Sequence, residues 1–176
     1  MTLSPLNTSN IEKAIHLYES AFPKIERRDT QAWQRMWKEN PQFHIHEILL
    51  PDNTFAGFIS YWDFSEFVYV EHFATMPHVR NQGIGRKVMA ALQQKISTPI
   101  VLEVEEPTNE IATRRIGFYE KQGFTIIHKT YLQPPYHEGY DYFPLLLMAT
   151  DEAYANQNFE HIVYHLYKYV YGVNPK

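Results

Sequence analysis

The chain of 176 residues contains no cysteine. This excludes disulfide scaffolds, metal or iron–sulfur sites with cysteine ligands, and any cysteine nucleophile. An excess of basic residues is also lacking: 16 Lys and Arg against 20 Asp and Glu give a net charge of −4, so no basic field indicates a nucleic-acid partner. No run of apolar residues in the sequence approaches the length of roughly 20 residues that a membrane helix needs. We expect a cytoplasmic protein without a nucleic-acid or membrane partner.

The composition is that of a globular domain. Hydrophobic residues make up 44% and charged residues 20%, and the length suits one domain over residues 1–176. We expect a core over about 1–149 and an added C-terminal helix over about 151–171. The aromatic content of 15%, with 13 Tyr, is too high for the core alone. Some rings are therefore expected to line a pocket or an interface.

Hydrophobic periodicity and turn residues divide the chain into alternating elements. Ser9 and Glu12 have the spacing of a capping box at the start of the first helix, and the charged segment 24–28 is interpreted as a solvated loop. The order of elements indicates a mixed α/β fold with a partly parallel sheet. Helices are expected after residue 9 to about 22, from 29 or 30 to about 40, and over about 84–95, 110–122 and 151–171; strands over 43–50, 55–62, 67–75, 100–104, 124–131 and 142–148.

The most informative segment is Arg80–Arg86, which joins a predicted strand to a predicted helix. A helix start leaves its first N–H groups without intrahelical acceptors and is slightly positive, so anions bind there. Gly83 and Gly85 allow a ligand to approach the backbone closely, and the two flanking arginines add positive charge. The turn is built like a pyrophosphate cradle, although it lacks the P-loop and dinucleotide patterns. The alternative is a tight turn with no ligand.

Two motifs together resemble one family. Arg80-x-x-Gly83-x-Gly85 after a strand resembles the acetyl-coenzyme A motif of the GNAT N-acetyltransferases. The segment Phe118–Phe124, with a Phe-Tyr near a helix end and then Gly-Phe, is similar to the second signature of that family. The resemblance covers roughly residues 43–148. The connection from Asn109 to Tyr119 is longer than the commonest family spacing.

The resemblance implies a GNAT-type fold: a mixed, partly parallel central sheet with splayed central strands, flanked by helices, plus the C-terminal helix. The splayed strands would be 67–75 and 100–104. The implied cofactor is acetyl-CoA, with no metal. Its pantetheine arm would meet the backbone of 73–75, and its pyrophosphate would lie on the amides of 82–86. The implied cofactor-binding residues are Phe73, Ala74, Thr75, Arg80, Asn81, Gln82, Gly83, Ile84, Gly85 and Arg86.

The resemblance also implies direct attack of an amine on the thioester, and the absence of cysteine fits a reaction without an acetyl-cysteine intermediate. Tyr119 matches the family tyrosine that acts as general acid; the alternative is that it only packs at a helix end. Glu71 and Glu103 are candidate general bases, because Glu is rare in a core and partial burial would raise its pKa. The alternative for both is a salt bridge, for example with Arg114 or Arg115. His72 is expected on the face opposite Glu71.

We therefore expect an acyltransferase that moves acetyl from acetyl-CoA to a primary amine of a small-molecule or amino-acid-like acceptor, in a ternary complex without a covalent enzyme intermediate. The alternative is a non-catalytic acyl-CoA-binding regulatory domain of the same fold. The C-terminal tyrosines either form a homodimer contact or cover apolar surface of their helix with their rings while their hydroxyls face water. The histidine pairs 44/46 and 161/165 are interpreted as surface or interface residues rather than zinc ligands. Candidate residues of the acceptor site are Phe22, Ile25, Glu26, Arg27, Trp33, Trp37, Tyr136, His137, Tyr140 and Tyr142.

Overall fold

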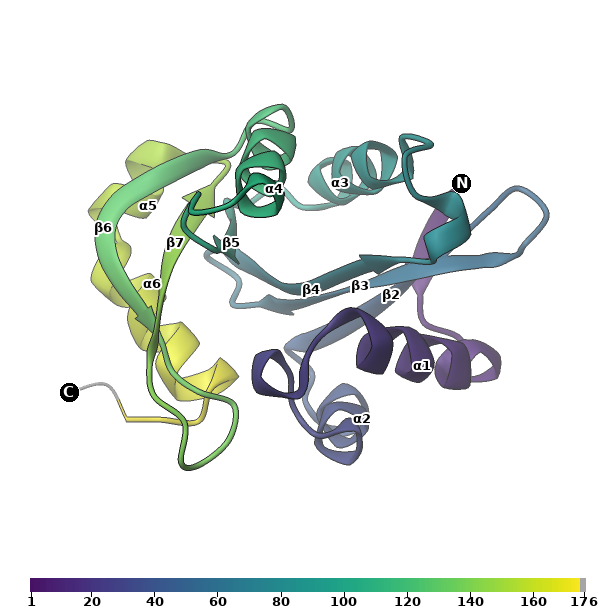
Figure 1. Cartoon of the computed structure of the whole chain (residues 1–176), viewed down its shortest axis with the longest axis horizontal. Coiled ribbons are helices and arrows are strands. Elements are labelled where there is room, and N and C mark those ends of the chain that lie inside the picture. The colour runs from purple at the N-terminus through teal and green to yellow at the C-terminus, as the bar shows by residue number, and fades with distance from the viewer. Residues whose placement is uncertain (175–176) are drawn as a thin grey trace. The chain divides into compact units, whose positions relative to one another are not determined.

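The computed structural model describes residues 1–174 and divides the chain into two compact units, which we call the first unit (residues 1–98) and the second unit (residues 99–174). Each unit has its own antiparallel strands and its own helices (Figure 1). In residues 1–174, no helix combines the length and the apolar character needed to cross a membrane. That the whole chain acts as a single domain stays a prediction.

The first unit is a four-stranded antiparallel arrangement in the order β1-β2-β3-β4. Helices α1 and α2 lie on one face of these strands and α3 on the other (Figure 1). Because both faces are covered, β3 is buried from Phe55 to Trp62. The elements are β1 (Thr2–Pro5), α1 (Ile11–Ala21), α2 (Thr30–Glu39), β2 (Phe43–Leu49), β3 (Phe55–Asp63), β4 (Val68–Thr75) and α3 (Ile84–Lys95), with 3₁₀ turns at Thr8–Asn10, Lys24–Glu26 and Pro77–Val79.

The helices and three of the strands of the first unit confirm the sequence predictions within about two residues. The capping box at Ser9 is wrong, because a 3₁₀ turn precedes α1: Asn7 accepts a hydrogen bond from the Ser9 backbone N–H, and Asn10 is the N-cap of α1. Strand β1 was not predicted, since its four residues carry no clear alternation. The interpretation of 24–28 as a solvated loop is wrong for Arg28, which is buried.

Strand β4 contains a β-bulge at Glu71. The register with β3 jumps from Ser60 opposite His72 to Tyr61 opposite Val70, so position 71 is the extra residue of the bulge. A bulge bends the strand and breaks the alternation of its side chains. The prediction that Glu71 and His72 lie on opposite faces is therefore wrong, and their side chains approach to 4.0 Å between His72 Nδ1 and Glu71 Oε1.

The second unit is an antiparallel arrangement in the order β5-β7-β6, with a register irregularity between Ile127 and Tyr131. Gly123 adopts a left-handed conformation (φ 86°) at the end of α4, as its position predicts. The expected single C-terminal helix is interrupted at Asn158 (φ −107°, ψ 20°) and ends in a π-helical turn. The elements are β5 (Ile100–Val104), α4 (Glu110–Glu120), β6 (Thr125–Gln133), β7 (Phe143–Ala149), α5 (Glu152–Gln157), α6 (Phe159–His165) and the π turn Leu166–Val170.

Replacing Gly57 by alanine should destabilise the protein by about 1–3 kcal/mol, the usual cost of overpacking. A Cβ at this position would lie 2.9 Å from Thr75 Cα and closer still to the Ala74 carbonyl oxygen. Both atoms belong to the β4 backbone and cannot rotate away. Urea denaturation measures the effect. Gly117→Ala in α4 is the control, because no atom lies within 4 Å of its added Cβ; it should leave stability unchanged or raise it by up to about 1 kcal/mol. Equal stabilities of the two variants would contradict the clash.

Candidate active site

The turn 80–86 is exposed apart from Ile84 and half-buried Gly85, and leads into α3. Gly83 is the N-cap residue with φ 72° and ψ 8°, and no side chain caps the helix. The first α-helical hydrogen bond is donated by Lys87 to the Gly83 carbonyl (3.2 Å), so the amides of residues 84–86 have no intrahelical acceptor. No atom lies within 4 Å of the position of a Cβ on Gly83. The turn therefore offers backbone donors beside open space, which fits a phosphate group.

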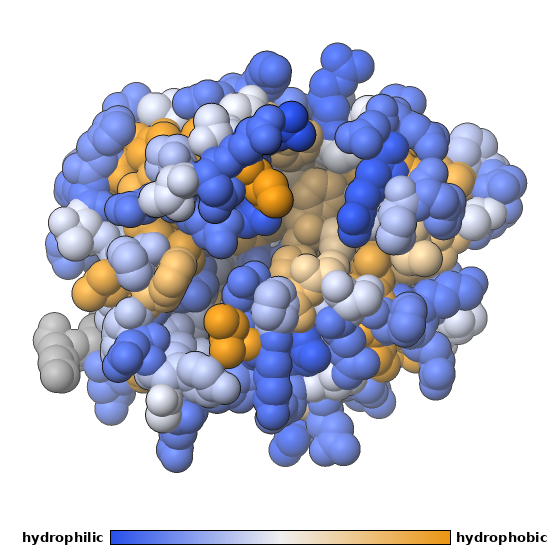
Figure 2. Space-filling view, viewed as in Figure 1, coloured by the Kyte–Doolittle hydropathy of each residue, from blue (hydrophilic) through white to orange (hydrophobic). Residues whose placement is uncertain are grey.

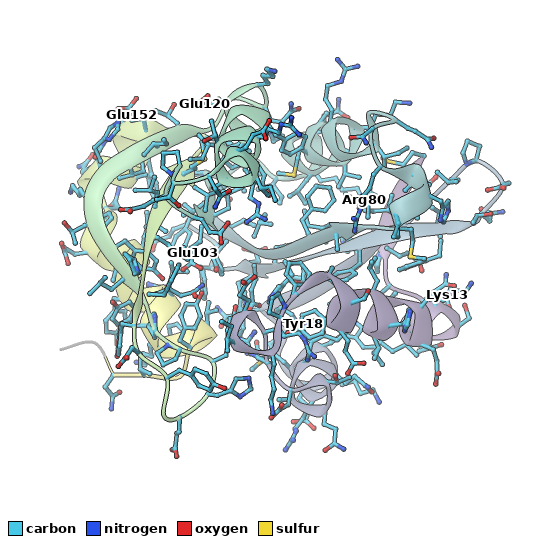
Figure 3. The ribbon with its side chains drawn as sticks, viewed as in Figure 1. Lys13, Tyr18, Arg80, Glu103, Glu120 and Glu152 are labelled. Carbon is cyan, nitrogen blue, oxygen red and sulfur yellow. The ribbon has the colours of Figure 1, made fainter. Side chains whose placement is uncertain are left out.

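Two side chains fix the shape of this turn. Arg80 Nε donates to the Thr75 carbonyl (3.3 Å), and Gln82 Nε2 donates to the His78 carbonyl (2.9 Å). Arg80 lies in the connection between β4 and α3 (Figure 3). Asn81 adopts a left-handed conformation (φ 61°), which asparagine tolerates better than most residues. The sequence prediction of a formed strand-to-helix turn with exposed arginines at 80 and 86 is confirmed; its ligand stays a prediction.

The three residues that the resemblance assigns to pantetheine lie at the end of β4. Phe73, Ala74 and Thr75 pair with Ile59, Phe58 and Gly57 of β3. Their backbone is held in an extended conformation on that side, and Gly57 permits the close approach of the two strands. The contact of this segment with pantetheine stays a prediction.

Glu71 lies in a buried cluster on the first unit. Its carboxylate forms an ion pair with Arg28 and accepts a hydrogen bond from Trp62 Nε1 (2.9 Å), and the exposed fractions of the Glu71 and Arg28 side chains are 0% and 9%. Burial alone would raise the pKa of Glu71, but Arg28, His72 and the hydrogen bond from Trp62 together hold it below its usual value. The predicted rise is wrong for Glu71, because the charge of Arg28 outweighs the effect of burial.

His72 lies among aromatic rings rather than in an open site. Its Nε2 lies 3.0 Å from the Glu26 carbonyl oxygen, and its ring packs edge-on against Tyr18 and Phe22 at centroid distances of 5.0 and 4.5 Å. Burial lowers the pKa of His72, and the nearby Glu71 charge only partly opposes that shift. The ring is therefore expected to be neutral at pH 7.

Glu103 lies at the centre of a hydrogen-bonded cluster on the second unit (Figure 3). Oε1 accepts from the Tyr131 hydroxyl, and Oε2 accepts from Gln133 Nε2 (2.6 Å) and from the Tyr171 hydroxyl (2.7 Å). Burial raises the pKa of Tyr131 well above its usual value, and the Glu103 charge raises it further. Tyr131 is therefore a hydrogen-bond donor at all ordinary pH values.

The two arginines that were predicted as alternative partners of Glu71 or Glu103 pair elsewhere. Arg115 Nη1 lies 3.1 Å from Glu105 Oε2, and Arg114 Nη2 lies 2.7 Å from Glu110 Oε1. These are exposed ion pairs with little effect on stability. The alternative of a salt bridge is thus confirmed for Glu71, but its partner is Arg28 and not Arg114 or Arg115.

Tyr119 lies at the end of α4 and is half-buried. Its ring contacts Phe118 and Phe124 at centroid distances of 5.1 and 5.6 Å. Burial raises the pKa of Tyr119 to about 12. Its hydroxyl makes no hydrogen bond to another group in residues 1–174, so the proton is available to a ligand. Asn109 caps the same helix by accepting from the Ala112 backbone N–H (2.9 Å).

Several predicted acceptor-site residues are accessible, and one is not. Trp33 is fully buried against Tyr18, with ring centroids 4.5 Å apart, so its prediction as a site residue is wrong. Ile25, Tyr140 and Tyr142 are exposed. The face of the molecule in Figure 2 is largely hydrophilic at its periphery, with scattered hydrophobic residues. Trp37 is half-buried and lines a pocket of about 310 Å³ beside α2 and β2.

Sequence reasoning missed five residues that contact the candidate bases: Arg28, Trp62, Tyr131, Gln133 and Tyr171. A signal existed for two of them, because Tyr131 and Gln133 are two residues apart on a strand and therefore share a face. No local signal connects Tyr171 to Glu103, which precedes it by 68 positions. The rings of His161 and His165 lie with centroids 4.2 Å apart and planes tilted by 51°, and the structure shows no group of three metal-ligating side chains between residues 1 and 174.

Comparison with known proteins assigns the family. Residues 11–124 match the family model described as acetyltransferase (GNAT) family. A solved structure from Bacteroides thetaiotaomicron, assigned to the same family, is 41% identical, covers 99% of this chain and 100% of its own, and superposes with a TM-score of 0.92. YjbC of Bacillus subtilis strain 168, assigned as an acetyltransferase, is 35% identical over 106 residues, which are 58% of this chain and 52% of YjbC. This chain thus matches about half the length of YjbC.

A more distant solved structure shows the fold alone. An aminoglycoside 6'-N-acetyltransferase complexed with coenzyme A is 17% identical, covers 85% of this chain and 96% of its own, and has a TM-score of 0.61. The predicted mixed α/β fold of GNAT type is confirmed by the Bacteroides structure. The chain therefore belongs to the GNAT acetyltransferase family and is an acyltransferase.

Proposed function

We propose that the protein transfers an acetyl group from acetyl-CoA directly to a primary amine of a small-molecule or amino-acid-like acceptor. The observation that carries the proposal is the exposed, uncapped turn 80–86, where backbone amides and open space above Gly83 suit the pyrophosphate of coenzyme A. Arg80 and Arg86 add charges that suit phosphate oxygens. The coenzyme A complex of the distant aminoglycoside acetyltransferase supports this choice of cofactor.

In the proposed reaction, the neutral amine nitrogen attacks the thioester carbonyl carbon, the carbon–sulfur bond breaks, and the products are the acetylated amine and the thiol of coenzyme A. Two protons leave the acceptor nitrogen. One proton leaves the acceptor ammonium for a base before the attack; a second leaves the nitrogen as the amide forms and balances the one that the departing sulfur gains from an acid. Tyr119 suits the acid role, because its hydroxyl keeps its proton to about pH 12 and makes no hydrogen bond within residues 1–174.

Of the two carboxylates, Glu103 suits the base role better. Glu71 is neutralised by the buried Arg28 guanidinium, which lowers its affinity for a proton. Glu103 is only half-buried, so a ligand or a water molecule can reach it, and the hydroxyls of Tyr131 and Tyr171 and the amide of Gln133 hold its carboxylate in place. We therefore assign Glu103, directly or through a water molecule, as the group that accepts the ammonium proton, and Glu71 as part of the framework of β4.

The decisive experiment combines acetyl-CoA with a panel of primary amines of three classes: polyamines, aminoglycosides and free amino acids. Release of free thiol and the mass of the product are followed together. The expected result is one acetylated amine for each thiol released, with the enzyme mass unchanged. An acetylated enzyme that passes its acetyl group to the amine would contradict direct transfer, and binding of coenzyme A without turnover of any amine would contradict the proposed acceptor class.

Arg86→Ala should weaken coenzyme A binding about tenfold, which is the loss expected for a charge-assisted contact to phosphate. Isothermal titration calorimetry measures the dissociation constant. Lys121→Ala, at the end of α4, is the control, because it removes one exposed positive charge at a position that the proposal does not use. If both variants bind coenzyme A like the wild type, the assignment of the turn 80–86 to the pyrophosphate fails.

A further inference from the structure

The C-terminal segment, which contains α5, α6 and the π turn, lies outside the part of the chain that matches the family model. That match ends at residue 124. Its last turn, Leu166–Val170, is π-helical: the Tyr171 backbone N–H donates to the Leu166 carbonyl five residues earlier (3.0 Å). A π turn adds one residue to a helical turn, so it changes the direction of every side chain that follows. Such turns are rare and occur often at functional sites.

The segment is firmly attached to β6 at this point. The Tyr167 hydroxyl donates to the Leu132 carbonyl (2.6 Å), and Leu166 and Val170 are buried. Directly after the π turn, the Val173 N–H donates back to the Tyr167 carbonyl (2.9 Å), and Gly172 takes a left-handed conformation (φ 69°) that ends the helix. The position of Tyr171 is therefore fixed from both sides.

This geometry brings the Tyr171 hydroxyl to the Glu103 carboxylate. The hydroxyl donates to Glu103 Oε2 (2.7 Å) and accepts from Gln133 Nε2 (2.8 Å), which also donates to Oε2 (2.6 Å). The three groups form a closed triangle in which each donor hydrogen has an acceptor. Packing of the Tyr136 ring against the Tyr171 ring, with centroids 5.1 Å apart, restricts the rotation of the phenol.

We propose that the C-terminal segment is a positioning element of the active site, and that Tyr171 orients the Glu103 carboxylate and stabilises its charged form. The inference rests on the role of Glu103 under Proposed function. Tyr171 does not touch the acceptor amine in this proposal. It acts through Glu103, as Tyr131 and Gln133 do from β6, and of these four residues only Glu103 lies within the part that matches the family model.

Tyr171→Phe removes the hydroxyl and keeps the ring. The expected kcat is about tenfold lower, which corresponds to about 1.4 kcal/mol, while the KM for acetyl-CoA is unchanged. The acidic limb of the pH profile of kcat should move to higher pH, because the carboxylate loses a hydrogen bond that stabilises its charged form. The other titratable hydroxyls beside Glu103 in the second unit are those of Tyr131 and, farther away, Tyr167, and both remain in this variant.

Two control variants separate positioning from folding. Tyr164→Phe removes an exposed hydroxyl of α6 that accepts a hydrogen bond from Lys168 Nζ (2.8 Å). Tyr167→Phe removes the hydrogen bond to Leu132 and should lower stability without moving the pH profile. If Tyr171→Phe shows the wild-type pH profile, or if Tyr167→Phe shifts the profile equally, Tyr171 has only a structural role and the inference is overturned.

A measurement without turnover separates this inference from the proposed function. The ¹³C NMR titration of the Glu side-chain carboxyl carbons, with Glu103 assigned through Glu103→Gln, should show a higher midpoint for Glu103 in Tyr171→Phe than in the wild type. An unchanged midpoint overturns the inference even when the amine panel shows acetyl transfer. A raised midpoint supports the Tyr171–Glu103 coupling even when no amine in the panel is acetylated, which would contradict only the acceptor class.

Discussion

Arg28→Met should lower the free energy of unfolding by about 3–5 kcal/mol, the usual cost of removing one member of a buried ion pair. The substitution keeps an unbranched chain of similar length but removes the guanidinium from a Glu71 side chain whose exposed fraction is 0%. The hydrogen bond from Trp62 and the neutral His72 cannot replace the lost positive charge. Urea denaturation at pH 7 measures the difference. Because the cluster also contains the bulge in β4, the loss should be accompanied by local changes at residues 70–72.

The stability lost in Arg28→Met should decrease as the pH falls. The pKa of Glu71 is lower in the folded protein than its usual value of 4.5, so the ion pair contributes its full stability above that pH and loses it as the pH falls through the folded-state pKa. Without Arg28, the burial of Glu71 raises its pKa instead, and protonation then relieves the cost of a buried charge. The difference in stability between wild type and Arg28→Met should therefore be largest near pH 7 and shrink towards pH 4.

Two comparisons test this explanation. Arg35→Met, which removes an exposed arginine of α2, should change stability by less than about 0.5 kcal/mol. Adding Glu71→Gln to Arg28→Met should recover part of the lost stability, because the buried charge is then absent. If the double variant is less stable than Arg28→Met by the full cost of a second independent substitution, the two residues do not act as an ion pair.

Features that depend on short stretches of sequence could be predicted. The left-handed Gly123 at the end of α4 follows from the demand for glycine after a helix, and it was located correctly. The strand-to-helix turn 80–86 was predicted from the same kind of local signal. By contrast, Ser9 was mistaken for a cap, because the 3₁₀ turn at Thr8–Asn10 moves the start of α1 by one residue.

Features that depend on distant contacts could not be predicted from the sequence. Glu71 was recognised as unusual, but its partner Arg28 is 43 positions earlier in a segment that resembles a solvated loop. The bulge that brings Glu71 beside His72 arises from the pairing of β3 with β4 and has no signature in β4 alone. Glu103 likewise could be selected as a buried acid, whereas Tyr171 reaches it only because of the π turn.

Tyr119→Phe should lower kcat by about two orders of magnitude, because general acid catalysis contributes roughly 10²- to 10⁴-fold. Stability should be unchanged. The hydroxyl makes no hydrogen bond to other groups in residues 1–174, and phenylalanine keeps the ring contacts with Phe118 and Phe124. The variant thus removes one proton donor and little else. Thiol release at saturating acetyl-CoA and amine measures kcat, and thermal denaturation checks that the fold is intact.

The pH dependence and a matched variant make the result specific. Since burial raises the pKa of Tyr119 to about 12, wild-type kcat should show no alkaline loss from this group between roughly pH 7 and 10. Tyr164→Phe, which removes an exposed hydroxyl from α6 of the same unit, should keep kcat within about twofold of wild type. If Tyr119→Phe retains the wild-type kcat with acetyl-CoA as well as with a thioester whose thiol is a better leaving group, another group protonates the sulfur. If kcat of Tyr119→Phe is low with acetyl-CoA but close to wild type with a thioester whose thiol has a lower pKa, then Tyr119 protonates the departing sulfur.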